Sequence, residues 1–519
     1  MRFRLAIFIL LGGLLPPDGV QAEAPSPLAV TDPAALRQLD VASGAHPGLG
    51  LGRMLDPGGA LTVPLANDAL FAMPAMAGIR SAIGEEFARY LAEHTDGDVG
   101  IGAAHAIQLF DRALLTSGAT RFVLAGIVDR MDRAYVAPAT CGEVRLIYRL
   151  TRIAGVAPGA QARLPMTLNL VLHAKRADDA ATSCADLARR WLAVGALPHS
   201  GPELAADLVA NDGALALLSP DLIDRIEINL QIAHRPKSEA REFRTDYLQK
   251  VFRLNATTRQ FEQAHMENQI DRDRILASDD LRAQFKSWLL DLAHLAEFDR
   301  GTVLIPEKFL ATGAVAATPA GLAPSNLQPA FGLMQSDGGA QAVFSDDDVV
   351  AALAGAVARG ILLQNIRSPA GFARRLNDIS CGGCHQIRGI GGFHFPGADS
   401  LAAPNSANVP ASPHFVGDQP RRRAIAVAIQ DGKTPDFSRG FSDRPQPRGS
   451  AVLAGSEYLD GWGATCYRPA TSAAETDKSF ASWKCASGLS CQPIGDESAS
   501  RFGMCFVATR VPRNRRTGR

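Results

Sequence analysis

The clearest chemical signal in this chain of 519 residues is a run of five: Cys381, Gly382, Gly383, Cys384 and His385. Two thiols separated by two residues can reach the two vinyl groups on one edge of a porphyrin and form thioethers, and the adjacent imidazole can then ligate the iron. Glycine between the thiols removes side chains where the backbone must lie close to the ring. In an exported protein this pattern predicts one covalently attached haem c, with His385 as the proximal iron ligand.

Other chemistries also use closely spaced cysteines. A thioredoxin-like redox pair requires a strand before the motif and a helix after it, whereas here a helical pattern precedes the motif and glycines follow it. A structural zinc site requires two further ligands, and the chain holds no second C-x-x-C pair. A plain disulfide between Cys381 and Cys384 stays possible in an oxidising compartment.

With this motif, the segment from about 345 to 450 resembles the cytochrome c superfamily. The residues after the motif are similar to the glycine- and proline-containing loop that follows the haem-binding helix in that superfamily. They include Gly389, Gly391, Gly392, Pro396 and Gly397. The resemblance implies that the carbonyl group of Pro396 accepts a hydrogen bond from the imidazole of His385. The whole chain also resembles uncharacterised bacterial exported proteins with one such motif, and that resemblance brings no known activity.

The sequence leaves the second axial ligand of the haem open. Small soluble members of the superfamily usually supply a methionine downstream of the motif, but the only methionine after His385 is Met504, in the cysteine-rich tail. The nearer candidates are His414, His394 and, upstream, Met334. Two histidine ligands would give a lower reduction potential than a histidine–methionine pair, whereas an open position would bind small ligands or peroxide. His394 can also be a packing residue between two phenylalanines.

The other six of the eight cysteines fall into two groups. Cys141 and Cys184 stand apart in the first half of the chain, and in an oxidising compartment we expect them to form a disulfide, with two buried free thiols as the alternative. The second group comprises Cys466, Cys485, Cys491 and Cys505. It predicts a small module that depends on disulfides because it cannot bury much surface. Its connectivity is open among three possibilities, and it serves either to dock a partner or to cap the chain.

The N-terminus predicts export. Arg2 and Arg4 precede an apolar run from Leu5 to Leu15, and Ala22 is the small residue that a signal peptidase prefers. Since the run is short for a membrane span, we expect a cleaved signal peptide at 1–22, a periplasmic or secreted protein and no transmembrane segment in the mature chain. Lys+Arg and Asp+Glu both number 53. This balance excludes nucleic acid as the expected partner; a redox partner protein or a small-molecule donor or acceptor is expected instead.

The elements that must position these residues show a mixed pattern. Runs rich in β-branched and aromatic residues predict strands, and segments of helical period predict helices. The strands are expected at 122–128, 144–150, 168–172, 226–232 and 247–254, and the helices at 87–94, 184–194 and 281–295. The strand at 226–232 alternates cleanly, which predicts one solvated face. Together they predict an α+β fold: a mixed, largely antiparallel N-terminal domain, a mainly α haem-binding segment and a small disulfide-rich C-terminal module.

Two further helices are predicted immediately before the motif. Ser345 is a natural N-cap for the first, and the aspartates at 346–348 occupy its first turn, where the helix dipole favours negative charge. A calcium or magnesium site is the alternative interpretation of these aspartates. Ser368 caps the second helix and Pro369 is its first residue. Its apolar face comprises Phe372, Leu376 and Ile379.

The composition divides the chain into six parts. They are a signal peptide at 1–22, a flexible lead-in at 23–60, an α+β domain at 61–305, a cytochrome c-like haem-binding region at 306–455, a cysteine-rich module at 456–510 and a basic tail at 511–519. Three arginines at 421–423 either neutralise the haem propionates or form an ordinary solvated charged surface.

The expected function is electron transfer by an exported c-type haem protein. A haem-dependent oxidoreductase or peroxidase, or a ligand sensor, is one alternative; a disulfide-stabilised surface or binding protein without haem is another. The sequence identifies no catalytic residue, because it carries neither an H-E-x-x-H motif nor a dinucleotide-binding fingerprint.

Overall fold

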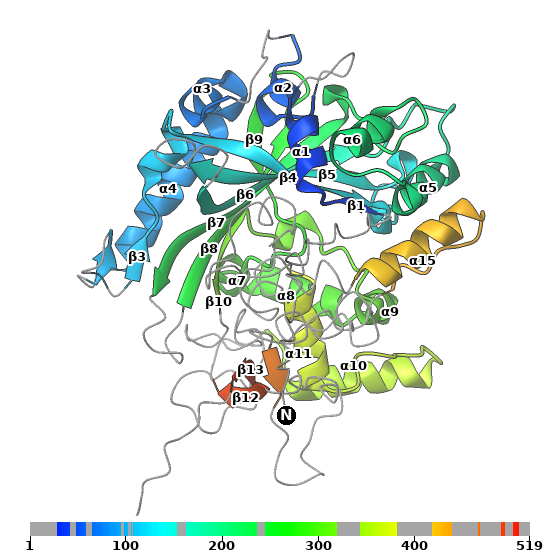
Figure 1. The fold of residues 1–519 in the computed structure, drawn as a ribbon. Coiled ribbons are helices and arrows are strands. Elements are labelled where there is room, and N and C mark those ends of the chain that lie inside the picture. The colour runs from blue at the N-terminus through cyan, green and yellow to red at the C-terminus, as the bar shows by residue number, and fades with distance from the viewer. Residues whose placement is uncertain are drawn as a thin grey trace, which may run out of the picture.

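A computed structural model describes residues 28–41, 48–58, 65–94, 98–101, 105, 107–152, 162–235, 244–318, 343–380, 418–438, 465–467, 489–493 and 502–507. These residues form a mixed α+β fold around a ten-stranded, largely antiparallel sheet (Figure 1). The predicted α+β class and the largely antiparallel character of the N-terminal part are therefore confirmed. The finer assignment of a haem-binding segment stays a prediction.

The long strands of the sheet lie next to one another in chain order. They are β4 (Thr120–Arg130), β5 (Glu143–Arg152), β6 (Ala162–His173), β7 (Ile223–Arg235) and β8 (Arg244–Leu254). Each pairs antiparallel with the next, and each contains one of the five predicted strands.

Short strands extend this sheet at both sides. They are β1 (Ala29–Val30) on β4, β3 (Ile107–Leu109) on β7, β2 (Val99–Gly100) parallel to β3, and β9 (Phe261–Ala264) and β10 (Gly313–Thr318) on β8.

Helices cover one face of the sheet (Figure 1). They are α1 (Pro33–Asp40), α2 (Leu51–Leu55), α3 (Asn67–Ala72), α4 (Ala77–Glu93), α5 (Cys184–Ala193) and α6 (Gly201–Val209). Every second residue of the central strands packs against them; Leu146, Leu168 and Ile226 are completely buried in this first core. The helices predicted at 87–94 and 184–194 correspond to the end of α4 and to α5.

The predicted flexible lead-in at 23–60 contains a strand and helices where the structure describes it. β1 pairs with β4, and Asp32 caps α1 by accepting hydrogen bonds from two backbone N–H groups of its first turn. Leu36 and Leu39 on α1 are buried in the first core. The composition of this stretch did not predict the helix, because the amphipathic pattern depends on only a few leucines that share one helix face.

A second, separate core follows in the chain. Its helices are α7 (Arg272–Leu276), α8 (Asp279–Leu289), α9 (Leu292–Arg300), α10 (Asp346–Ala358) and α11 (Pro369–Asp378). The buried residues of the first core lie before Ile270 in the chain, the last of them being Phe261, except for Ala426 on the later helix at 419–430. Those of the second core begin at Ile270. The domain boundary predicted after 305 falls inside the second core, which includes Ile305 and Phe309.

The single helix predicted at 281–295 is two helices in the structure. α8 ends at Leu289, and Asp291 caps α9 by accepting a hydrogen bond from the backbone N–H of Ala293 at 2.9 Å. A side chain that competes for backbone N–H groups starts a new helix here, although the apolar period continues across the break.

Two small pieces complete the described fold. α15 (Gln419–Gln430) contacts α5. β11 (Thr465–Tyr467), β12 (Leu489–Pro493) and β13 (Phe502–Val507) form a separate three-stranded antiparallel sheet in the order β11-β13-β12. None of the helices in the described part of the chain combines the length and apolar character needed to cross a bilayer.

Candidate functional site

The C-x-x-C-H motif lies between two described segments of the chain. Its residues Cys381, Cys384 and His385, and the candidate second ligands His394, His414 and Met334, lie outside the described residues. The described chain reaches Ser380, directly before the motif, and resumes at Asp418. The donor set of two thiols and one imidazole suits a covalently bound haem.

α11 leads directly to the motif. The side chain of Ser368 accepts a hydrogen bond from the backbone N–H of Gly371 at 3.0 Å, and Pro369 is the first helical residue, so the predicted helix start is confirmed. Phe372 and Leu376 are completely buried, and Ile379 is buried just beyond the helix. The predicted apolar face therefore fixes the segment that ends three residues before Cys381.

A buried hub at Asp299 holds α11 and the loop before it. The Asp299 carboxylate accepts hydrogen bonds from the backbone N–H groups of Gln364, Asn365 and Ile366 at 2.9, 2.8 and 2.7 Å. The backbone carbonyl of Asp299 accepts a hydrogen bond from Nη2 of Arg375 at 2.7 Å. Because Asp299 belongs to α9, these bonds attach the loop at 364–366 and α11 to the second core.

The aspartates at the start of α10 have a structural role in helix capping. Ser345 Oγ accepts a hydrogen bond from the Asp348 N–H at 3.2 Å, and Asp348 Oδ2 accepts one from the Ser345 N–H at 2.8 Å. Lys286 Nζ lies 2.7 Å from the same carboxylate and, with the hydrogen bonds, lowers the pKa of Asp348. The predicted cap is confirmed. Among the residues that the structure describes, no group of three or more His, Cys, Asp or Glu side chains is arranged to hold a metal ion.

A buried ion cluster fixes α15, the next described helix after the motif, to the turn Met131–Arg133 that follows β4. Arg421 Nη2 lies 3.0 Å from Asp132 Oδ2, and Arg422 Nε lies 2.8 Å from Asp418 Oδ2. Arg130 Nε also contacts Asp132, at 2.8 Å. Burial alone would raise the pKa of Asp132, but the guanidinium groups, foremost that of Arg130, hold it well below its ordinary value.

This cluster corrects the interpretation of residues 421–423 as a solvated charged surface for Arg421 and Arg422, whereas Arg423 is exposed. Arg422 is only 5% exposed, and Arg421 is half-buried. Both guanidinium groups pair with carboxylates of the protein itself. Sequence reasoning missed this because Arg421 and Asp132 are 289 residues apart.

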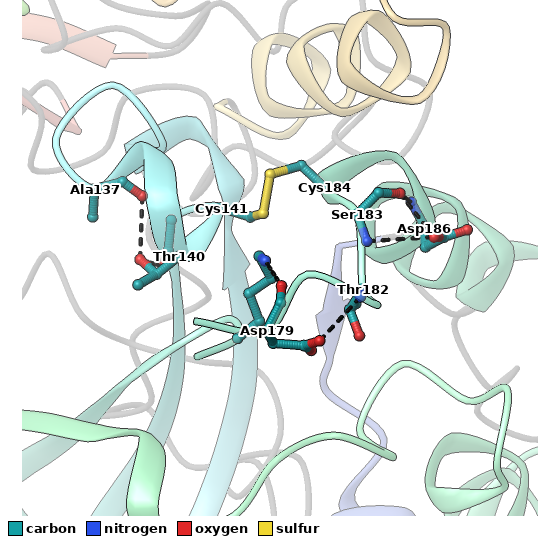
Figure 2. The surroundings of a disulfide bond; sticks show 10 residues. Ala137, Thr140, Cys141, Asp179, Thr182, Ser183, Cys184 and Asp186 are labelled. Atoms are coloured by element: carbon teal, nitrogen blue, oxygen red, sulfur yellow. Dashed lines mark hydrogen bonds between the residues drawn. A yellow bond between two sulfur atoms is a disulfide. The ribbon is translucent and has the colours of Figure 1, made fainter. Parts of the chain in front are cut away.

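The predicted disulfide between Cys141 and Cys184 is present (Figure 2), with Cα atoms 5.4 Å apart and a sequence separation of 43. Cys141 adopts a left-handed backbone conformation in the turn before β5. Cys184 is the first residue of α5, which is capped by Ser183. The bridge therefore fixes the start of α5, against which α15 packs, to the sheet.

The face of the sheet opposite the first core carries a network of ion pairs centred on Glu143. Its carboxylate lies 3.1 Å from Arg145 and 2.8 Å from Arg225, and a third guanidinium, of Arg133, lies at 3.9 Å. Arg145 and Arg225 also pair with Glu227 at 3.0 and 2.9 Å. Although burial opposes ionisation, these guanidinium groups, above all that of Arg225, hold the pKa of Glu143 far below its ordinary value.

The strand at 226–232 alternates between buried and partly exposed residues as predicted, and this network covers part of its more exposed face. Glu227 is half-buried, and it pairs with arginines on its own strand and on β5. Alternating charged residues indicated the correct strand, but the sequence alone does not show which residues lie beside them in the sheet.

The cysteine-rich region is described only in its three short strands. Cys466 lies on β11, and Cys505 on β13 is the register partner of Cys491 on β12. Cys491 is disulfide-bonded. Cys485 lies outside the described residues, and the connectivity within the module stays a prediction.

Comparison with known protein families, with curated proteins and with solved structures finds no match to this chain.

Proposed function

We propose that this protein is an exported c-type haem protein whose function is electron transfer. The C-x-x-C-H motif at 381–385 carries the proposal: Cys381 and Cys384 would form the thioethers and His385 would ligate the iron. The Cys141–Cys184 disulfide supports the choice of compartment, because structural disulfides persist in the periplasm and outside the cell.

The described residues support a fixed start for the chain that enters the motif. When bound, the haem would supply one-electron chemistry at its iron. α11 holds the chain before the motif in the second core, and Arg375 and Asp299 attach it to α9. Asp132 and Arg421 attach α15, the next described helix, to the turn Met131–Arg133. A fixed helix directly before a redox centre suits electron transfer, because the centre then needs little rearrangement when its charge changes.

The pyridine haemochrome spectrum of protein produced with a cytochrome c maturation system tests the haem proposal. We expect a thioether-haem band in the wild type and its loss in Cys384→Ala. Cys505→Ala is the matched control, since it removes a cysteine outside the motif and should leave the band unchanged. A wild type without the band, or a band that survives Cys384→Ala unchanged, would reject covalent attachment through this motif.

Carbon monoxide binding to the reduced protein separates electron transfer from ligand or peroxide chemistry. A six-coordinate haem should not bind carbon monoxide readily, and His414→Ala, His394→Ala and Met334→Ala then identify the second axial ligand by opening the site. Rapid carbon monoxide binding by the wild type, with turnover of peroxide, would instead support a haem-dependent oxidoreductase, peroxidase or ligand sensor.

The disulfides favour one second candidate, a disulfide-stabilised surface or binding protein without haem. The Cys141–Cys184 bridge and the bonded Cys491 are as useful to such a protein as to a cytochrome. Absence of the haemochrome band from correctly exported protein would support this candidate over the first.

A further inference from the structure

Three side-chain amides share a small area on the face of the sheet opposite the first core. They belong to Asn169 on β6, Asn229 on β7 and Gln249 on β8. Gln249 is the register partner of Asn229, and Asn229 is that of Thr167, which lies two residues before Asn169 on the same strand. Residues two apart on a strand share a face, and register partners lie about 5 Å apart. The Cβ atoms of the three amide residues therefore lie within roughly 12 Å of one another.

These amides are buried without a hydrogen-bond partner. Asn169 is 8% exposed and Gln249 is 5% exposed. Within the part of the chain that the structure describes, Asn169 Oδ1, Asn229 Oδ1 and Gln249 Oε1 are all buried and accept no hydrogen bond. A buried amide in this state destabilises a fold, because it loses its hydrogen bonds to water and gains none in return. Three of them on adjacent strands point to a bound molecule that supplies the missing bonds.

The side chains around the amides are those of a small-molecule site. Ile147, Val171 and Val251 lie beside them on the same face and are buried, although they belong to neither of the two cores. Tyr247, two residues before Gln249 on β8, adds a buried aromatic ring. Small-molecule sites are lined mostly by apolar and aromatic side chains, with a few polar groups that fix the orientation of the ligand.

The charges on this face favour a neutral ligand. The carboxylates and guanidinium groups of the network around Glu143 pair with one another. Arg149, the register partner of Thr167, also has an interaction of its own. The groups left to bind a ligand are therefore the uncharged amides. A hydroxyl group suits them best, because it both donates and accepts and so satisfies an amide in either orientation.

We propose that this face of the sheet binds a neutral carbohydrate, whose hydroxyl groups donate hydrogen bonds to the side-chain oxygens of Asn169, Asn229 and Gln249. The ring of Tyr247 offers an apolar surface to the C–H groups of the sugar. A sugar presents several hydroxyl groups on one small ring, which matches three amides spread over adjacent strands. The proposal is independent of the haem, because the described residues of the sheet alone carry it.

Isothermal titration calorimetry of the full-length exported protein tests the proposal. The probes are D-glucose, D-galactose, N-acetyl-D-glucosamine and maltose. We expect saturable binding of at least one of these sugars, with one site per chain.

Two variants then locate the site. Asn229→Leu and Gln249→Met each replace an amide by an apolar side chain of similar size. Each should weaken binding about tenfold, the usual effect of one lost hydrogen bond. The melting temperature of the ligand-free protein should stay the same or rise, because a buried polar atom without a partner is removed. The matched control is Gln260→Met, at an exposed glutamine beyond the end of β8, which should bind sugar like the wild type.

Several results would overturn the proposal. Absence of saturable binding by all four sugars is one, and it needs no variant. Wild-type affinity in both variants is another. A lower melting temperature of the ligand-free variants is the third, because it would show that the amides have structural partners. Haem attachment is measured separately by its spectrum, so the proposed function can fail without changing any of these outcomes.

Discussion

Replacement of Glu143 by glutamine should destabilise the sheet more than the substitution of any exposed charged residue. The Glu143 side chain is 6% exposed and lies 2.8 Å from Arg225 and 3.1 Å from Arg145. Glutamine has nearly the same size, so the substitution removes the charge while leaving the packing in place. The guanidinium groups around it, which are 11–15% exposed, would lose the carboxylate that they share.

The expected loss follows from the cost of leaving buried charges without a partner. Breaking a buried ion pair typically costs 3–5 kcal/mol, and we expect the lower end, about 3 kcal/mol, because Arg145 and Arg225 keep Glu227 as a second partner. For a unit the size of the first core, about 2–4 °C per kcal/mol converts this loss to a fall in the melting temperature of roughly 6–12 °C.

Thermal unfolding followed by far-ultraviolet circular dichroism is the assay, with Asp178→Asn as the control. Asp178 pairs with Arg176 on the surface, where both side chains are exposed, so its substitution should leave the melting temperature unchanged. Because the folded state lowers the pKa of Glu143, its contribution is complete above the ordinary carboxylate pKa and is lost as the pH falls through the folded value. A melting temperature of Glu143→Gln within about 1 °C of the wild type would show that the network is not stabilising.

Three further predictions concern other parts of the fold. Cys184→Ala should reduce the free energy of unfolding by up to about 4 kcal/mol, since it opens a loop of 43 residues; urea unfolding should show the same loss for Cys141→Ala and no further loss for the double variant. Arg422→Ala should leave Asp418 with one partner fewer and make α15 more sensitive to limited proteolysis. Arg423→Ala changes an exposed position of the same helix and should not have this effect. Equal cleavage of the two variants would argue against the ion cluster. Burial raises the pKa of Asp129 to about 7, so the folded state binds its proton more tightly than the unfolded state and stability should fall as the pH rises from about 4 to 7. Asp129→Asn should flatten that fall, and an unchanged pH profile of the melting temperature would contradict the assignment.

The sequence alone determined the features that depend on local chemistry. The five long strands, the end of α4, α5, the caps at Ser345 and Ser368 and the apolar face of α11 follow from residue period and from side chains that bond to nearby backbone. The Cys141–Cys184 pair followed from a count of cysteines in an oxidising compartment. The haem hypothesis depends in the same way on five adjacent residues, and it stays a prediction.

Only the tertiary structure decided which distant residues share an environment. Glu143 and Arg225 are 82 residues apart, and strand register places them 2.8 Å from each other. The same holds for Asp132 with Arg421, and for Arg375, whose hydrogen bond to the Asp299 carbonyl joins residues 76 apart in the chain. Local propensity and period act over a few residues, whereas burial and charge pairing depend on packing between elements that are remote in the chain. The sequence therefore predicts the chemistry of the motif, and the structure shows which charges and helices hold α11 before it and α15, the next described helix.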